Sequence, residues 1–357
     1  MSATTELLEV SQDVNYLTKS KRNIVFDLFR FVLATMIICI HFGFNFFKFE
    51  YYPIFRLAVP TFFMISGFFI FKEDKKKELD RSVVFIKSSL KYVLIGFLIY
   101  LIYDILRLSN NTGELRNYVA GLFVEDAFLT LFIKNNVITS GNHLWFLLAL
   151  LSLSIFNYVM VRFNLSKWYP FIGIIMFPIY LWICLEVKLF GDVHFRVNWI
   201  FVGLPAFSIG YGLRWLTSKL KNINAWWSVV FFVLGCVFMI LQVYECQWYL
   251  KVDMAYYFCS LLSAICFVLF CHFLGEGSKH QKVENFQQKI SDWFYKWVGP
   301  KSTFYIYILH MIIGRFCVKF LAVSGIPLVL IIFIISFLVY EICYLITKFY
   351  KYILNVW

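Results

Sequence analysis

The chain has 357 residues, of which 61% are hydrophobic and 15% are charged. Soluble domains contain about 25% charged residues, so this composition excludes a soluble globular protein and indicates an integral membrane protein. The net charge of +12 does not indicate a nucleic-acid partner, because the Lys and Arg side chains stand in short segments between apolar runs. There they orient a multi-pass protein in the membrane, and membrane lipids are the expected surroundings.

We predict an all-α bundle of about ten transmembrane helices, since a span needs about 20 apolar residues. The third expected span follows Lys87 and Lys91 and ends near Leu106, and the fourth extends from NHLWFLLALL to about Arg162. The other eight cover about 24–41, 54–71, 169–185, 199–214, 226–244, 254–273, 303–320 and 326–346.

Residues 1–357 are predicted to form a single domain with both termini in the cytoplasm, because this orientation places most Lys and Arg side chains inside. Residues 1–20 are expected to be a cytoplasmic tail and not a signal peptide, and residues 275–301 a cytoplasmic loop. Residues 109–141 include Glu125 and Asp126 within an apolar stretch. A lipid-exposed span would not tolerate them, so we expect an outer-face loop with interfacial helices.

The first expected span carries Arg30 and His41 at its two ends, separated by FVLATMIICI. Eleven residues make about three helical turns, so both side chains share one face and lie about 16 Å apart along the axis. Ionisable groups are costly in hydrocarbon, which indicates a polar path inside the bundle. Asp27, three residues before Arg30, can pair with it, and a plain anchoring ion pair is the competing interpretation.

His41 is the sharpest candidate for chemistry. An imidazole titrates near pH 6.5 and can take a proton from a hydroxyl group, or it can be acylated itself. The competing interpretation is a helix-contact histidine that only hydrogen-bonds the backbone of a neighbouring helix. His310, in STFYIYILH, is a second imidazole inside an apolar span and indicates the same cavity.

Three further segments contain candidate binding residues. Arg56 precedes a helix that also carries Ser66, and it can either hold a polar or anionic substrate or extend to the membrane surface. Trp145, in NHLWF, is either a substrate contact or an interfacial aromatic residue. Lys87 and Lys91 either form a basic entrance for a phosphorylated cytosolic ligand or serve only as topology signals. The nine cysteines have no CxxC spacing, and no metal site is expected.

In combination and order, DLFRFVLATMIICIH, FRLAVPTFFMISGFF, NHLWFLLALL and STFYIYILH resemble the membrane-bound acyltransferase family 3. The resemblance covers nearly the whole chain. In that family a ten-helix bundle transfers acyl groups from cytosolic acyl-CoA to extracytoplasmic sugars or other acceptors. Where the family often has an Arg-x-x-Arg pair on the acyl-CoA side, the best-matching positions are Ser89 and Tyr92, with Lys87 and Lys91 close by.

The resemblance implies an O-acyltransferase of the bacterial cytoplasmic membrane that uses acetyl-CoA to modify a carbohydrate of the cell envelope. Arg30 and His41 match the family's Arg-x10-His signature, and this assigns catalysis to them, with His41 as general base or acyl relay. The implied donor-binding residues are Lys87, Lys91 and Arg30; the implied acceptor-binding residues are Arg56, Ser66, Trp145 and His310.

Two other classes of function stay open at this point. A transporter or flippase of a small molecule or lipid-linked sugar also needs Arg and His in a midplane cavity. It does not need acyl-CoA, and no inverted repeat is visible in the sequence. A membrane scaffold or sensory subunit without chemistry predicts that replacing His41 has no effect.

Overall fold

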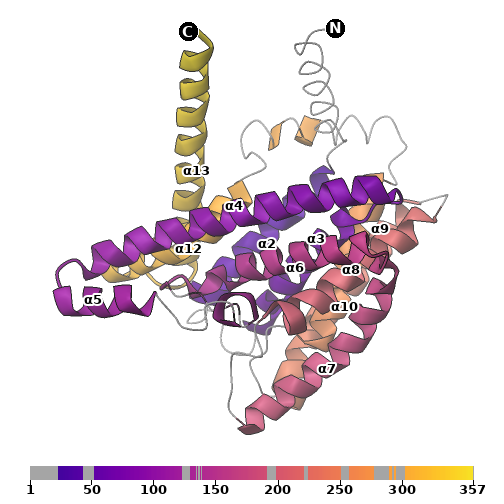
Figure 1. The fold of residues 1–357 in the computed structure, drawn as a ribbon. Helices are drawn as coiled ribbons and strands as arrows, with labels where there is room; N and C mark the ends of the chain where they lie inside the picture. Colours follow the sequence, from indigo (N-terminus) through magenta and orange to yellow (C-terminus); the bar gives the residue numbers. More distant parts are fainter. Residues whose placement is uncertain are drawn as a thin grey trace.

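The computed structural model describes residues 23–42, 52–122, 129–133, 135, 137, 139–190, 198–220, 224–250, 257–276, 289–291, 293–294 and 302–356. All regular elements in these residues are helices, so the all-α class is confirmed (Figure 1). The expected tail at 1–20, Glu125 and Asp126 lie outside the described residues, as does most of the expected loop at 275–301.

The first half of the described chain contains α2 (Ile24–Phe42), η1 (Tyr52–Leu57), α3 (Ala58–Ile70), α4 (Lys75–Leu108), α5 (Thr112–Gly121), η2 (Leu129–Ile133), η3 (Asn142–Leu144) and α6 (Trp145–Arg162). The second half contains η4 (Ser166–Trp168), α7 (Tyr169–Phe190), η6 (Trp199–Gly203), α8 (Leu204–Ser218), α9 (Trp226–Tyr244), η7 (Glu245–Leu250), α10 (Phe258–Glu276), α12 (Ser302–Phe316), η8 (Cys317–Leu321) and α13 (Gly325–Val356).

Eight helical segments in the described residues are long and apolar enough to cross a membrane, which supports a multi-pass membrane protein. They match eight of the ten expected spans in position. The other two expected spans, 169–185 and 199–214, coincide with α7 and α8. Neither is among the eight, and α8 has only 15 residues. The count of ten therefore stays a prediction, as does the location of the two termini.

Helix α4 differs from the expected third span. We expected a helix that starts after Lys87 and Lys91, but α4 starts at Lys75 and has 34 residues. The Asp74 carboxylate accepts a hydrogen bond from the Lys77 backbone N–H at 2.8 Å, and Glu78 lies in the first turn. Both features stabilise a helix N-terminus, so the charged run KKKELDR is helical and not a loop.

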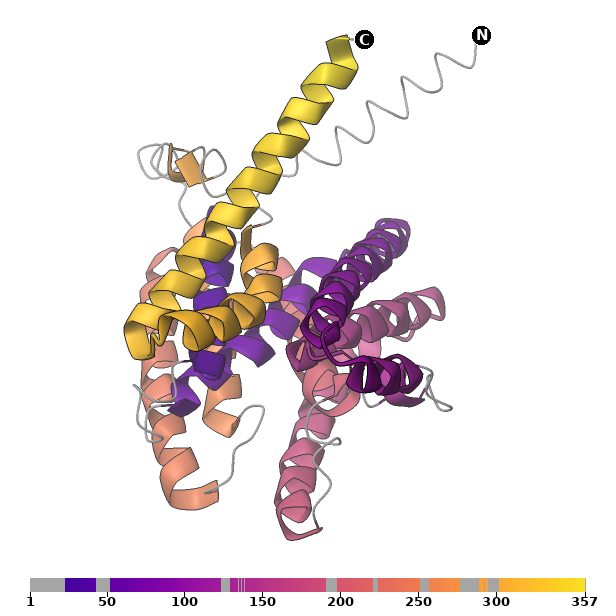
Figure 2. The ribbon, with the colours of Figure 1, turned by 90° about the vertical axis from the view of Figure 1, so that its left-hand side faces the viewer.

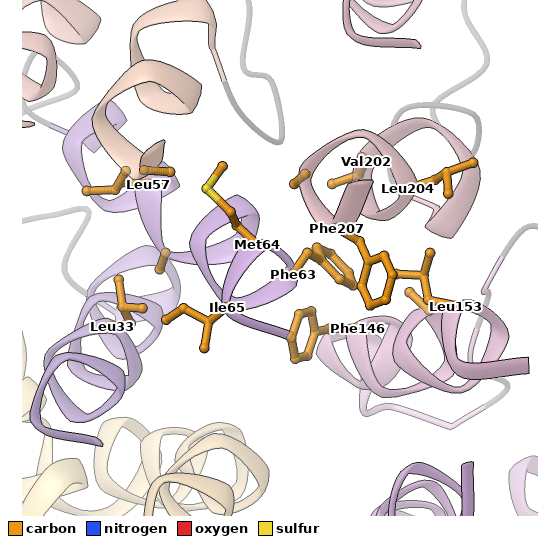
Figure 3. Close-up of a cluster of buried hydrophobic side chains, with 14 of the residues drawn as sticks. Leu33, Leu57, Phe63, Met64, Ile65, Phe146, Leu153, Val202, Leu204 and Phe207 are labelled. Atoms are coloured by element: carbon orange, nitrogen blue, oxygen red, sulfur yellow. The ribbon is translucent and has the colours of Figure 1, made fainter. Parts of the chain in front are cut away.

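The core lies where α3, α6 and α8 meet. Phe63 and Met64 of α3 and Phe207 of α8 are fully buried, and Phe146 of α6 packs on Phe63 with ring centroids 4.7 Å apart (Figure 3). The contacts of α2 with α3, α10 and α12 place it at the centre of the bundle. Helix α13 packs beside α12 and then extends beyond the other helices toward the C-terminus (Figure 2). The central position of α2 explains how its side chains reach several neighbouring helices.

Asp104, near the end of α4, fixes the segment that follows this helix. Its side chain is fully buried, and its Oδ2 accepts hydrogen bonds from the Tyr118 hydroxyl at 3.0 Å and the Ser140 backbone N–H at 2.8 Å. Burial and the nearby Asp104 carboxylate raise the pKa of Tyr118, which keeps its hydroxyl protonated as a donor. Helix α5 is thereby held beside the end of α4 (Figure 1).

The variant Asp104→Ala is expected to be destabilised by about 1–3 kcal/mol, because it leaves two partly buried donors, the Tyr118 hydroxyl and the Ser140 N–H, without their acceptor. Thermal unfolding in lipid nanodiscs measures the loss. Asp80→Ala is the matched control, since Asp80 is exposed on the same helix and its replacement should change stability by less than about 0.5 kcal/mol. Equal shifts for the two variants would contradict the role of Asp104.

Candidate active site

Helix α2 holds the Arg and His of the predicted signature at its two ends. Arg30 Nη1 donates to Asp27 Oδ1 at 2.9 Å, and its guanidinium lies 5.1 Å from the centre of the Phe69 ring. The expected ion pair is confirmed. His41 lies in the last turn, eleven residues and about 16 Å further along the axis. Arg30 therefore does not contact His41; the helix connects two separate places in the bundle.

Three histidines from three separate segments meet at the end of α2 that carries His41. The centre of the His41 ring lies 5.2 Å from that of His310 on α12 and 6.2 Å from that of His143 in η3. The rings of His143 and His310 lie 4.7 Å apart. We call these three residues the histidine cluster. His310 therefore lies beside His41, but it is not among the residues that line the cavities next to His41, so the prediction of a shared cavity stays a prediction.

Tyrosines hold the cluster in position. The Tyr307 hydroxyl donates to the His143 backbone carbonyl, and the Tyr307 carbonyl lies 2.6 Å from His310 Nδ1. The Tyr100 ring lies 5.1 Å from the His143 ring, and its hydroxyl donates to the Ile308 carbonyl at 2.8 Å. These bonds connect η3, α4 and α12, and they fix the backbone of His143 and the ring of His310.

Several imidazole nitrogens of the cluster are available to a ligand. The two ring nitrogens of His143 and the Nε2 atom of His310 have no hydrogen-bond partner among the described residues, although both side chains are buried. Nδ1 of His310 faces a carbonyl and must carry the hydrogen in the neutral ring, so its Nε2 is an acceptor. Buried polar atoms normally have hydrogen-bond partners, so these imidazole nitrogens are the atoms of the cluster that could still accept or donate a hydrogen bond.

A cavity of about 80 Å³ opens beside the cluster. His41, His143 and Tyr307 contribute its polar wall together with Arg56 from η1. The apolar wall comes from α2, α3 and α6: Ile37, Ile40, Val59, Phe62, Trp145 and Phe146. A small apolar cavity with a few convergent polar groups is the usual form of a substrate site.

The electrostatics around His41 are positive. Arg56 and Arg315 both lie close enough to act on its charge, and Arg315 also donates to the Ser140 carbonyl at 3.0 Å. In the described part of the chain, no group of three or more His, Cys, Asp or Glu side chains is arranged to hold a metal ion. The site can thus stabilise a developing negative charge with guanidinium groups.

Of the other predicted site residues, some line the cavity and others lie away from it. Trp145 and Arg56 line the cavity, and their predicted contact with the acceptor stays a prediction. Ser66 lies one turn beyond Phe62 on α3, and its hydroxyl donates to the Phe62 carbonyl at 2.9 Å, so it is not part of the cavity wall. Lys87 and Lys91 are exposed on α4. Measured along the helix, they precede Tyr100, which contacts the cluster, by about 20 Å and 14 Å.

The positions that match the family's Arg pair take part in packing. Ser89 is buried, and the Tyr92 ring lies 4.1 Å from the Phe304 ring of α12. Neither side chain can bind phosphate as Arg does. The exposed face of α4 at this level carries Lys87 and Lys91 instead.

Three residues of the site, His143, Tyr100 and Arg315, were not predicted from the sequence. His143 was not assigned a role, although the motif NHLWF contains it, because a histidine beside an interfacial Trp gives no signal of its own. Tyr100 and Arg315 were not predicted either. Their contacts join positions 143, 308 and 140 to residues up to 208 positions away in the chain, and no local pattern reports such contacts.

The family comparison agrees with this geometry. The family model for acyltransferase 3, described as an acyltransferase domain, matches residues 23–348. That range includes all of the residues that form the cluster and the cavity. No curated protein and no solved structure shows a significant match to the chain.

Proposed function

The chain belongs to acyltransferase family 3, and on this premise we propose that it is an integral-membrane O-acetyltransferase that takes acetyl groups from cytosolic acetyl-CoA. The proposed acceptor is a hydroxyl group of an extracytoplasmic or lipid-linked carbohydrate. The observation that carries the proposal is the histidine cluster beside a small cavity within apolar helices, with Arg56 in its wall.

The geometry suits a direct transfer. His41 takes the proton from the acceptor hydroxyl while the oxygen attacks the thioester carbonyl carbon. The negative charge that forms on the carbonyl oxygen is stabilised by Arg56, which lines the same cavity. The C–S bond then breaks, and the CoA thiolate receives the proton from His41.

A relay through His41 is the second route. The imidazole attacks the thioester, CoA leaves, and the acceptor oxygen then takes the acetyl group from the imidazole. Rapid mixing distinguishes the two routes. A burst of CoA release without acceptor, equal in amount to the enzyme, indicates the relay; no burst indicates direct transfer.

Arg30, Lys87 and Lys91 are proposed to hold the phosphates of the donor. Along α2, Arg30 precedes His41 by about 16 Å, and along α4, Lys87 and Lys91 precede Tyr100 by about 20 Å and 14 Å. These separations suit a donor whose phosphates stay at the membrane surface while its thioester reaches His41. In this arrangement Arg30 has a positioning role, because it does not contact the cavity.

Acetyl-CoA turnover by purified protein in nanodiscs, with extracted membrane glycans as acceptor, tests the proposal. We expect CoA release that depends on the acceptor and incorporation of labelled acetyl into the glycan. A folded wild-type protein that moves a solute but consumes no acyl-CoA would instead favour the transporter.

The double variant Lys87→Ala/Lys91→Ala is expected to raise the KM for acetyl-CoA about 3- to 10-fold with little change in kcat. Two exposed charge contacts are worth about 1 kcal/mol together, and they act on binding and not on the reacting atoms. Steady-state kinetics at low ionic strength measure the effect. Lys76→Ala/Lys77→Ala, on the first turn of the same helix, is the matched control and should leave KM unchanged.

A further inference from the structure

A second cavity, of about 250 Å³, touches His41 from another direction. It is lined by Phe42 of α2, Val318 of η8, Leu328 of α13 and the connection 322–324 between η8 and α13. Ala322 has a left-handed backbone conformation with φ of 50°, which marks a tight turn at this connection. The cavity is larger and more open than the first.

His41 is the one described residue that lines both cavities. The first cavity uses Ile37 and Ile40, which precede His41 on α2 and lie toward Arg30. The second uses Phe42, which follows it. On α12 and η8 the order is the same: Tyr307 belongs to the first cavity and Val318, three turns further on, to the second. The two cavities therefore meet at His41 but extend among different segments, the first among η1, α2, α3 and α6 and the second at the η8–α13 connection.

The volume of the first cavity limits what it can hold. An apolar cavity of about 150 Å³ accepts benzene, which has six heavy atoms. By that measure the 80 Å³ beside His41 holds about three heavy atoms, the number in an acetyl group. Phe62 and Phe146, whose rings lie 5.8 Å apart, form part of its apolar wall, so they are the side chains whose truncation would enlarge it.

The second cavity has room for about ten heavy atoms on the same scale, close to one sugar ring. Ala322 and Ser324 are exposed, so this cavity is reachable from outside the bundle. Next to Val318 on η8, the Lys319 ammonium lies 5.3 Å from the Phe320 ring. Aromatic and cationic side chains of this kind lie at membrane surfaces.

We propose that His41 separates an acetyl pocket, the first cavity, from an acceptor port, the second cavity, so that donor and acceptor meet at this imidazole from opposite sides. The inference rests on the proposed function. It places acceptor entry at the η8–α13 connection, whereas the sequence analysis placed it beside Arg56 and Trp145. The acceptor oxygen attacks the carbonyl carbon across His41, the C–O bond forms as the C–S bond breaks, and the proton passes by way of His41 to the thiolate.

Filling the acceptor port tests one half of the proposal. Val323→Trp is expected to raise the half-saturating amount of extracted membrane glycan at least tenfold and to leave the KM for acetyl-CoA unchanged. Ser324→Trp provides a second variant at the same wall in case the first does not fold. Ile326→Trp is the control, because Ile326 is exposed on α13 nearby and does not line the cavity.

Enlarging the acetyl pocket tests the other half. Wild type is expected to prefer acetyl-CoA over butyryl-CoA by at least tenfold in kcat/KM, since each misfitting methylene costs about tenfold or more. Phe62→Ala should reduce that preference about tenfold. Phe71→Ala is the matched control, a half-buried Phe just after α3 that packs on Tyr211, away from the cavity.

The outcomes distinguish a failure of this inference from a failure of the proposed function. This inference is overturned if both port variants turn over with the acceptor dependence of wild type, or if Phe62→Ala keeps the chain-length preference of wild type. The proposed acetyltransferase activity stands in either case. If folded wild-type protein consumes neither acetyl-CoA nor butyryl-CoA, both this inference and the proposed function are overturned. Loss of acceptor affinity in the port variants together with relaxed chain length in Phe62→Ala supports the assignment of both cavities.

Discussion

Replacing His41 by Ala is expected to lower acetyl transfer by about two to four orders of magnitude, the usual contribution of a positioned general acid–base group. His41 lines both cavities and lies beside two further imidazoles, so it is the group through which a proton passes in either proposed route. Water in the vacated space does not replace it, because a water molecule is a much weaker base at neutral pH. CoA release with extracted membrane glycans measures the loss, per mole of folded protein.

His272→Ala is the matched control for this prediction. His272 is an imidazole on another central helix, α10; it is buried, whereas His41 is exposed, and its Nδ1 lies 3.5 Å from a Glu276 carboxylate oxygen. It packs on Phe68, which contacts Phe26 near the start of α2, at the other end of this helix from His41. Its replacement should keep transfer within about threefold of wild type. If both variants lose activity equally, or if His41→Ala keeps it, the chemical role of His41 is refuted.

Replacing Gly67 by Ala is expected to destabilise the fold by about 3 kcal/mol or more and to lower the yield of folded protein. A Cβ at Gly67 on α3 would collide with the backbone carbonyl of Phe207 on α8, and one at Gly210 on α8 with that of Met64 on α3. Each glycine admits the backbone of the other helix, and neither carbonyl can move without separating the two helices. Overpacking of this kind typically costs about 1–3 kcal/mol, and rigid backbone atoms place it at the upper end.

Thermal unfolding in nanodiscs, followed by tryptophan fluorescence, measures this loss for Gly67→Ala and for Gly210→Ala. Gly121→Ala is the control, because a Cβ at this last residue of α5 meets no other atom within 4 Å. Ala is also the better helix former, so this variant should be as stable as wild type or slightly more stable. A Gly67→Ala protein as stable as Gly121→Ala would show that α3 and α8 can separate without cost.

The apolar runs predicted the helices well because a membrane span depends on composition over about 20 residues, which is a local property. The Asp27 to Arg30 pair was predictable for a similar reason, since residues three apart share a helix face. Helix α4 shows the limit of this reasoning. Its first turns, KKKELDR, are too charged to read as a span, yet the Asp74 cap and the continuous backbone hydrogen bonds make them part of one long helix.

By itself, the order of motifs in the chain determined the family, and the spacing of Arg30 and His41 determined that one helix carries both. Tertiary structure alone decided that His143 joins His41 and His310, that Ser66 lies outside the cavity, and that His41 is shared by two cavities. The physical reason is that these relations come from packing between segments about 100 to 270 residues apart. Such contacts depend on how whole helices fit against one another, as α3 and α8 do at Gly67 and Gly210, and not on the residues beside each histidine.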